Sequence, residues 1–166
     1  IIILLSFDST PLSKYAIFIL FIYCGTSDFF DGYIARKLNK TTAIGKLMDP
    51  IADKLLTTSI LLILINVKVI SSLFFVAALI IILRELFISG LREFLSSLGE
   101  SLPVNNTGKL KTATQFVSLG ALLFGYASNF QIALQIGNIL LCIAAMLTLF
   151  SGLIYLRNGL IIIKKT

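Results

Sequence analysis

The sequence contains no histidine and no tryptophan, two cysteines, three prolines and few charged residues. The lack of histidine excludes His-based catalysis and His-ligated metal sites. Cys24 and Cys142 stand alone in apolar runs without the spacing of a zinc site, so we interpret them as buried free thiols. Charged residues make up 13% of the chain, about half the share in a soluble domain.

Apolar residues make up 57% of the 166 residues, and the mean hydropathy is +0.98. This composition predicts a membrane protein, with a single domain over residues 1–166. The net charge is +6, but no dense basic run is present, so we do not expect nucleic acid as a partner. The basic residues stand mainly at the ends of apolar segments, which suits lipid headgroups or a ligand that carries phosphate.

Hydropathy predicts an all-α protein with six transmembrane helices. The first helix, 1–7, is too short to cross a bilayer, which takes about 20 residues. It also lacks the features of a signal peptide, so we interpret it as the end of a helix that starts before Ile1. No alternation typical of strands is visible, and the run lengths favour helices over a barrel. The other five segments are 12–38, 50–67, 69–98, 108–127 and 131–157.

The distribution of Lys and Arg predicts the orientation, since the side rich in these residues faces the cytoplasm. With six spans, both termini would then be cytoplasmic. Only Lys14 and Lys68 fall on the opposite side. The rich side holds Arg36, Lys37, Lys40, Lys46, Lys54, Arg92, Lys109, Lys111, Arg157, Lys164 and Lys165.

Half of the eight acidic residues lie in one short stretch, as Asp28, Asp31, Asp49 and Asp53. Asp28 and Asp31 are three residues apart, and Asp49 and Asp53 are four apart, so each pair shares a helix face. Asp49 followed by Pro50 predicts a helix start, with the aspartate as N-cap and the proline at the first helical position. Two helices would therefore each offer two carboxylates near the same membrane surface.

Four carboxylates near lipid need compensating charge, and ionisable residues in such places mark functional sites. Salt bridges to Arg36, Lys46 and Lys54 are one possibility, and protonation, as in the proton relay of a transporter, is a second. Metal ions are the interpretation that we favour. Carboxylate oxygens suit Mg²⁺ or Mn²⁺, and four can bridge two such ions about 3.5–4 Å apart.

The full spacing is Asp28-x2-Asp31-Gly32-x2-Ala35-Arg36-x8-Gly45-x3-Asp49-x3-Asp53. It resembles the signature of the CDP-alcohol phosphatidyltransferases, and all eight fixed positions match. "RELFISGLREF" at 84–94 and "GKLKTATQ" at 108–115 are similar to the bacterial phosphatidylglycerophosphate synthase branch of that family. The resemblance covers essentially the whole chain.

The resemblance implies a six-helix fold, a homodimer, a polar cavity open to the cytoplasm and a place in the bacterial cytoplasmic membrane. It implies two divalent cations, Mg²⁺ or Mn²⁺, and transfer of a phosphatidyl group from CDP-diacylglycerol to an alcohol with release of CMP. Asp53 would be the catalytic base and a metal-associated carboxylate. The other metal ligands would be Asp28, Asp31 and Asp49, and the CDP site would use Asp28, Gly32, Ala35, Arg36 and Gly45. Judged from the residues alone, the small side chains at Gly32, Ala35 and Gly45 fit either ligand approach or close helix packing.

Four cations are candidates for binding a phosphorylated acceptor: Arg84, Arg92, Lys109 and Lys111. Arg84 lies deep in an apolar run, although Glu85 beside it is able to neutralise it, and the other three also suit anchoring of helix ends to headgroups. Arg84 and Arg92 are about 80° apart on an ideal helix, and Lys109 and Lys111 about 160°, so we do not expect all four on one phosphate.

Together with the resemblance, these cations favour sn-glycerol 3-phosphate as the acceptor and phosphatidylglycerophosphate as the product. The alternatives are another acceptor within the family (inositol phosphate, serine or phosphatidylglycerol), an ion-coupled transporter, or a structural membrane protein.

Overall fold

The structure is a computed structural model that describes residues 10–37, 43–100 and 106–163, with backbone alone at 28–37, 43–50, 106, 107 and 109. No strand occurs in these ranges, so the all-α prediction is confirmed for the described part. The predicted first helix, 1–7, lies outside it. The helices are α2 (Pro11–Lys37), α3 (Ala43–Asn66), α4 (Leu73–Ser97), α5 (Asn106–Ser128) and α6 (Gln131–Ile163).

The predicted start of the third segment is wrong. Helix α3 begins at Ala43, so Pro50 lies inside the helix and Asp49 is not its N-cap. Pro50 lacks only the amide that would bond to the carbonyl of Lys46. Membrane helices tolerate such a proline, because neighbouring groups satisfy the carbonyl that it leaves without a partner. Helix α2 starts one residue before the predicted residue 12. Thr10 Oγ1 accepts a hydrogen bond from the backbone amide of Ser13, and Pro11 occupies the first helical position.

Three helices end in a left-handed residue that closes the last turn. Lys68 follows α3 (φ 59°), Gly99 follows α4 (φ 78°) and Asn129 follows α5 (φ 54°). In each case the next residue's amide donates to the carbonyl five residues earlier, as in the Schellman motif. The turn after α3 delays the start of α4 to Leu73 instead of residue 69. At the other end of the chain, α6 continues past Arg157 to Ile163, although Asn158 and Gly159 form a pair that often ends a helix.

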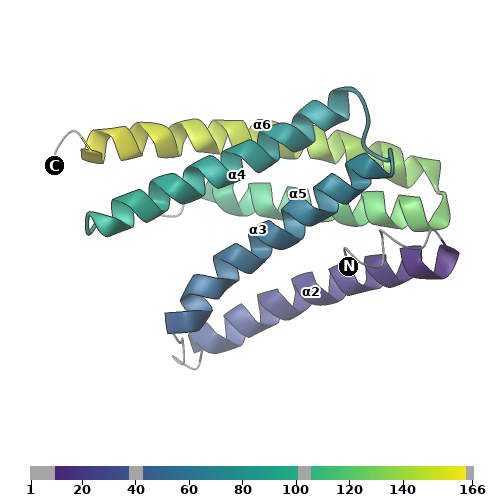
Figure 1. Cartoon of the computed structure of the whole chain (residues 1–166), viewed down its shortest axis with the longest axis horizontal. Coiled ribbons are helices and arrows are strands. Elements are labelled where there is room, and N and C mark those ends of the chain that lie inside the picture. Colours follow the sequence, from purple (N-terminus) through teal and green to yellow (C-terminus); the bar gives the residue numbers. More distant parts are fainter. Residues whose placement is uncertain (1–9, 38–42, 101–105, 164–166) are drawn as a thin grey trace. The chain divides into compact units, whose positions relative to one another are not determined.

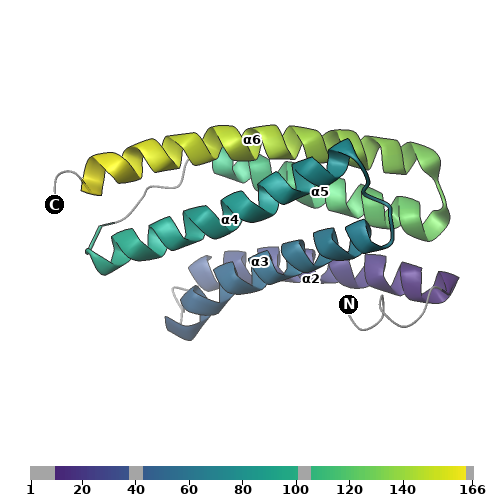
Figure 2. The ribbon, with the colours of Figure 1, turned by 45° about the horizontal axis from the view of Figure 1, so that its top comes forward.

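The chain divides into two compact units, and the first combines Ile1–Ile70 with Leu119–Gly137. Within it, α2 and α3 run side by side in opposite directions (Figures 1 and 2). Phe18 of α2 contacts Phe124 of α5, with ring centroids 5.6 Å apart. The fully buried side chains of this unit lie on α2, α3 and α5 and in the turn after α3: Ile17, Phe21, Ile60, Leu61, Leu64, Ile70, Leu119, Leu122 and Leu123.

Close helix packing at the α5–α6 turn depends on two glycines of the first unit. A Cβ at Gly137 would lie 2.7 Å from Leu122 Cγ and 3.0 Å from the Leu122 backbone nitrogen. A Cβ at Gly125 would meet Leu134 as closely. Only a residue without a side chain fits at these positions. The backbones of α5 and α6 therefore approach closely on both sides of the turn that joins them, at Gly125 before it and at Gly137 after it.

The second unit combines Ser71–Ser118 with Asn138–Thr166 and therefore holds α4, the first half of α5 and most of α6. Buried Ile81, Ile88 and Leu95 recur every seven residues along α4. The interior is otherwise unusually polar. Among the described residues, five of the six buried polar or charged side chains belong to this unit: Lys111, Gln115, Ser118, Thr148 and Ser151.

Two of the described helices, α4 and α6, are long and apolar enough to cross a membrane. Only 22% of the most apolar stretch of α4, and 39% of that of α6, is buried inside the structure. A core helix of a soluble protein would be mostly buried, so these outward apolar side chains favour contact with lipid. The six-span topology and the polar cavity stay predictions. Cys24 and Cys142 are free thiols as expected, but half-buried instead of buried.

Candidate functional site

The four signature aspartates lie on two consecutive helices of the first unit. Asp28 and Asp31 occupy the last turns of α2, and Asp49 and Asp53 occupy the first turns of α3. Lys37 and Ala43 are six positions apart in the sequence and therefore at most about 22 Å apart, so these two helix ends lie close together (Figure 1). The helical backbone confirms the expected spacing, and each pair of aspartates shares one face of its helix.

The donor chemistry of these residues fits divalent cations, because four carboxylates are hard oxygen ligands. The structure describes only the helical backbone at seven of the predicted site residues, and their side chains lie outside the described part. These residues are Asp28, Asp31, Gly32, Ala35, Arg36, Gly45 and Asp49. Asp53 is described and is exposed. The described side chains form no group of three or more His, Cys, Asp or Glu residues. The metal centre and the CDP site therefore stay predictions.

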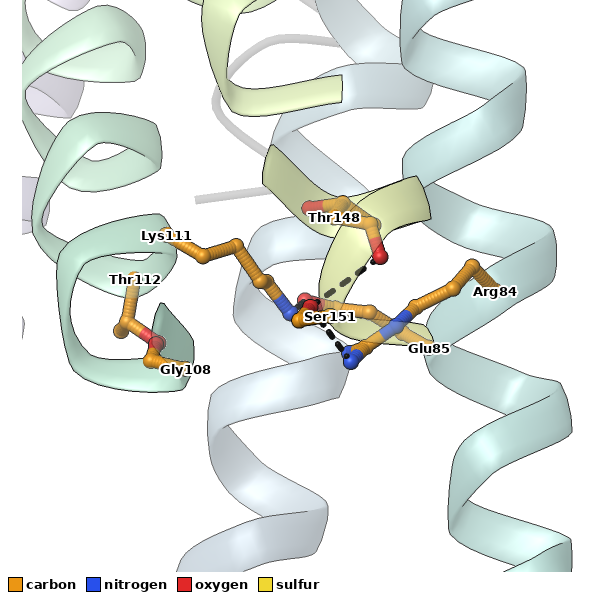
Figure 3. Close-up of polar contacts among 7 residues, drawn as sticks. All are labelled: Arg84, Glu85, Gly108, Lys111, Thr112, Thr148 and Ser151. Atoms are coloured by element: carbon orange, nitrogen blue, oxygen red, sulfur yellow. Dashed lines mark hydrogen bonds and ion pairs between the residues drawn. The ribbon is translucent and has the colours of Figure 1, made fainter. Parts of the chain in front are cut away.

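The second unit holds a polar cluster built around Arg84 of α4. Its Nη2 donates a hydrogen bond to Ser151 Oγ of α6 at 2.9 Å, and Ser151 Oγ donates to the Thr148 carbonyl at 3.1 Å. Figure 3 shows Arg84 and Lys111 extending toward Ser151 from α4 and α5. Gly152 gives the arginine room, since a Cβ there would lie 3.2 Å from its Cγ and Nε.

Glu85 forms an ion pair with Lys111 of α5, with Nζ and Oε1 2.8 Å apart. The side chains are only 8% and 13% exposed, for Lys111 and Glu85 respectively. The sequence suggested that Glu85 neutralises its neighbour Arg84, but the pair that the structure records joins it to a lysine 26 residues later. The ion pair connects α4 to α5. It also places one carboxylate, that of Glu85, beside the cationic side chains of the polar cluster.

Arg84 and Arg92 converge on the ring of Tyr155 in α6, although they are about 80° apart around an ideal helix. The guanidinium carbon of Arg92 lies 4.7 Å from the ring centroid, and that of Arg84 lies 5.8 Å from it. Both distances are within the range of a cation–π interaction. Tyr155 is buried, and a Cβ at Gly108 of α5 would lie 3.8 Å from its hydroxyl oxygen.

The polar cluster keeps hydrogen-bonding capacity that the described side chains do not use. Arg84 Nε and Thr148 Oγ1 are buried without a partner. Three cations, Arg84, Arg92 and Lys111, face one carboxylate, Glu85, so this group carries a surplus of two positive charges. A surplus of this size, with an unused N–H donor, suits an anion such as a phosphate dianion.

The structure thus brings together three of the four predicted acceptor-site cations, and their role in binding an acceptor stays a prediction. The side chain of Lys109 lies outside the described residues. Sequence reasoning missed Ser151 and Tyr155, because both stand in the long apolar run of α6. Their signal was a helical spacing of polar and small residues within that run: Thr148, Ser151, Gly152, Tyr155 and Gly159.

Comparison with known proteins decides the family. The sequence profile described as CDP-alcohol phosphatidyltransferase matches residues 1–150. The chain belongs to the CDP-alcohol phosphatidyltransferase family. A Rickettsia bellii relative, named CDP-diacylglycerol–glycerol-3-phosphate 3-phosphatidyltransferase, is 40% identical over 158 residues, which cover 95% of this chain and 86% of that protein.

Two further relatives carry the same name in other bacteria. The Bacillus subtilis protein is 37% identical, with 92% of this chain and 77% of its own length covered. The Haemophilus influenzae protein is 39% identical, with coverage of 84% and 74%. In this member of the CDP-alcohol phosphatidyltransferases, the signature stretch is the end of α2 and the start of α3, and the polar cluster belongs to α4, α5 and α6.

Proposed function

We propose that this protein transfers the phosphatidyl group of CDP-diacylglycerol to sn-glycerol 3-phosphate and releases phosphatidylglycerophosphate and CMP. The observation that carries the proposal is the 37–41% identity, over more than 90% of the chain, to relatives named for this reaction. The signature aspartates and the cationic cluster support it independently, since they offer partners for a pyrophosphate and for a phosphorylated acceptor.

Asp28, Asp31, Asp49 and Asp53 would hold two divalent cations, Mg²⁺ or Mn²⁺. When bound, such ions supply positive charge that offsets the aspartates and stabilises the negative charge of the pyrophosphate and of the leaving CMP. Gly32, Ala35 and Gly45 would let the nucleotide approach the backbones of α2 and α3. Arg36 would bind near the pyrophosphate, with Asp28 also on the CDP side.

Asp53 would act as the general base. Its carboxylate accepts the proton of the acceptor's 1-hydroxyl, and the resulting oxygen attacks the β-phosphorus, which bears the diacylglycerol. A new bond forms between that oxygen and the β-phosphorus, while the bond from the β-phosphorus to the bridging oxygen breaks and CMP leaves. The exposure of Asp53 on α3 supports this role, because a base must reach its substrate.

Arg84, Arg92, Lys109 and Lys111 are the candidates for binding the acceptor's phosphate. Arg84 and Arg92 are the stronger candidates for binding this phosphate, since Lys111 already makes its ion pair with Glu85. Arg84 also retains an N–H donor without a partner. A neutral alcohol would leave this cationic surplus without compensation, which favours a phosphorylated acceptor.

The architecture that we propose has six membrane helices, the first of which would include residues 1–7. The protein would be a homodimer in the bacterial cytoplasmic membrane, with a polar cavity and active site open to the cytoplasm. The outward apolar faces of α4 and α6 support membrane insertion, and the distribution of Lys and Arg supports the orientation.

An acceptor screen tests the proposal. The purified protein in lipid nanodiscs receives labelled CDP-diacylglycerol, Mg²⁺ or Mn²⁺, and one of five acceptors: glycerol 3-phosphate, glycerol, inositol phosphate, serine or phosphatidylglycerol. We expect metal-dependent CMP release and labelled phosphatidylglycerophosphate with glycerol 3-phosphate. Reactions without acceptor or without metal measure background hydrolysis. Faster transfer to another acceptor at equal concentration would contradict the assignment of the acceptor, and no CMP release with any of them would contradict the reaction.

A further inference from the structure

Helix α6 presents one continuous face to the two arginines of α4. Thr148, Ser151, Gly152, Tyr155 and Gly159 follow the spacing of three and four residues that places side chains on one side of a helix. The contacts confirm which side this is. Ser151 and Gly152 contact Arg84, Tyr155 lies beneath both guanidinium groups, and Gly159 faces Leu91 of α4.

Ser151 fixes one end of the Arg84 guanidinium by a directed pair of hydrogen bonds. Its hydroxyl proton is committed to the Thr148 carbonyl, so its oxygen lone pairs are left to accept from Arg84 Nη2. Ser151 is fully buried, and water does not compete for this bond. Nε, another N–H donor of Arg84, has no partner among the described atoms, and the bond from Nη2 to Ser151 sets the direction in which Nε points.

Tyr155 makes the second contact that positions the arginines, because its buried ring lies near both guanidinium groups. Two arginines repel each other, and the partial negative charge on the faces of the ring offsets part of this repulsion. No carboxylate among the described residues is recorded in an ion pair with either arginine, and Glu85 pairs with Lys111. An arrangement that holds three cations beside a single carboxylate is suited to binding an anion between or beside the arginines.

We propose that Ser151 and Tyr155 are positioning residues, which orient Arg84 and Arg92 so that both donate to the phosphate of the acceptor. This inference rests on the proposed transfer to glycerol 3-phosphate. Neither α6 residue needs to touch the substrate. Their effect is to hold two long, flexible side chains in the binding geometry before the acceptor arrives, which lowers the entropic cost of binding it.

The test measures KM and kcat separately for glycerol 3-phosphate and for CDP-diacylglycerol, with the full chain in nanodiscs. S151A removes the acceptor of the Arg84 hydrogen bond, and Y155L removes the ring. We expect each to raise KM for glycerol 3-phosphate about tenfold, the effect of losing one charge-assisted or cation–π contact, with KM for CDP-diacylglycerol unchanged.

Two matched controls accompany these variants. Y155F keeps the ring and loses only the hydroxyl, so it retains a KM for glycerol 3-phosphate within about twofold of the wild type. S97A removes an exposed hydroxyl of α4 that donates to the Phe94 carbonyl, and it also leaves both KM values within about twofold. If S151A does not accumulate, S151C tests the same hydrogen bond, because a thiol keeps the volume but accepts weakly.

The outcomes separate the two proposals. If the wild type transfers to glycerol 3-phosphate but S151A and Y155L leave its KM unchanged, the positioning role is wrong and the proposed function stands. If both KM values rise together, in step with a fall in melting temperature, the α6 residues are structural and the inference is overturned. If the wild type does not use glycerol 3-phosphate, the proposed function and the inference both fail.

Discussion

Replacing Glu85 with glutamine is the sharpest test of how the polar interior of the second unit is stabilised. Two unit charges 2.8 Å apart attract by about 6 kcal/mol at an effective dielectric constant of about 20. The glutamine oxygen still accepts a hydrogen bond from Lys111 Nζ, which retains about 1.5–3 kcal/mol of this. We therefore expect E85Q to lower the free energy of unfolding by about 3–4 kcal/mol, the range found when one partner of a buried ion pair is removed.

The assay is equilibrium unfolding of the purified protein in mixed micelles, followed by circular dichroism as the denaturing detergent increases. E93Q is the matched control, since it makes the same chemical change on the same helix at an exposed position. We expect it to change the free energy of unfolding by less than about 0.5 kcal/mol. Adding K111M to E85Q removes the lysine charge left without its carboxylate, so the double variant regains part of the lost stability.

Two results would refute this reasoning. Equal losses in E85Q and E93Q would mean that the Glu85–Lys111 pair contributes no more than an exposed carboxylate. Strict additivity of E85Q and K111M would mean that the two side chains do not interact, because residues in direct contact show a coupling energy in a double-mutant cycle.

Three other predictions concern the helix packing and the chemistry. G137A should cost about 1–3 kcal/mol in the same unfolding assay, because its Cβ meets Leu122, whereas G90A, with nothing within 4 Å, should stabilise α4 by about 0.5–1 kcal/mol. A stable G137A would contradict the close approach of α5 and α6. D53N should lower kcat by about 10²–10⁴ if Asp53 is the general base. Metal content measured in parallel distinguishes loss of the base from loss of a ligand, and near wild-type turnover would exclude the role. EDTA should abolish CMP release, and Mg²⁺ or Mn²⁺ should restore it. Activity that survives complete removal of metal would contradict the two-cation proposal.

The helices themselves were largely predictable, because apolar runs of this length have few alternatives in a membrane. The boundaries were less so. Asp49 and Pro50 carry the local signal of a helix start, yet α3 begins at Ala43, because one missing amide does not interrupt a helix whose neighbours continue the pattern. Likewise, nothing in the composition of residues 67–72 announces the turn that delays α4 to Leu73; it depends on a left-handed Lys68.

The partners within the site could not be predicted in the same way. Glu85 has Arg84 beside it in sequence, but its recorded partner is Lys111, which approaches only when α5 packs against α4. Ideal helix geometry placed Arg84 and Arg92 about 80° apart. Their meeting at Tyr155 depends on long side chains and on the position of α6. The aspartate signature is the reverse case, since its spacing in the sequence is enough to indicate the family.

The Glu85–Lys111 pair also bears on how the chain is made. Helices α4 and α6 are long and apolar enough to cross a membrane, whereas α5, between them, carries a lysine that ends up buried. A lone charge at the centre of a membrane helix costs about 2.5–3.5 kcal/mol on insertion, and less toward the headgroups. Because α4 leaves the ribosome before α5, a carboxylate is already in place when Lys111 arrives. The order of synthesis thus supplies the counter-charge before the charge that needs it.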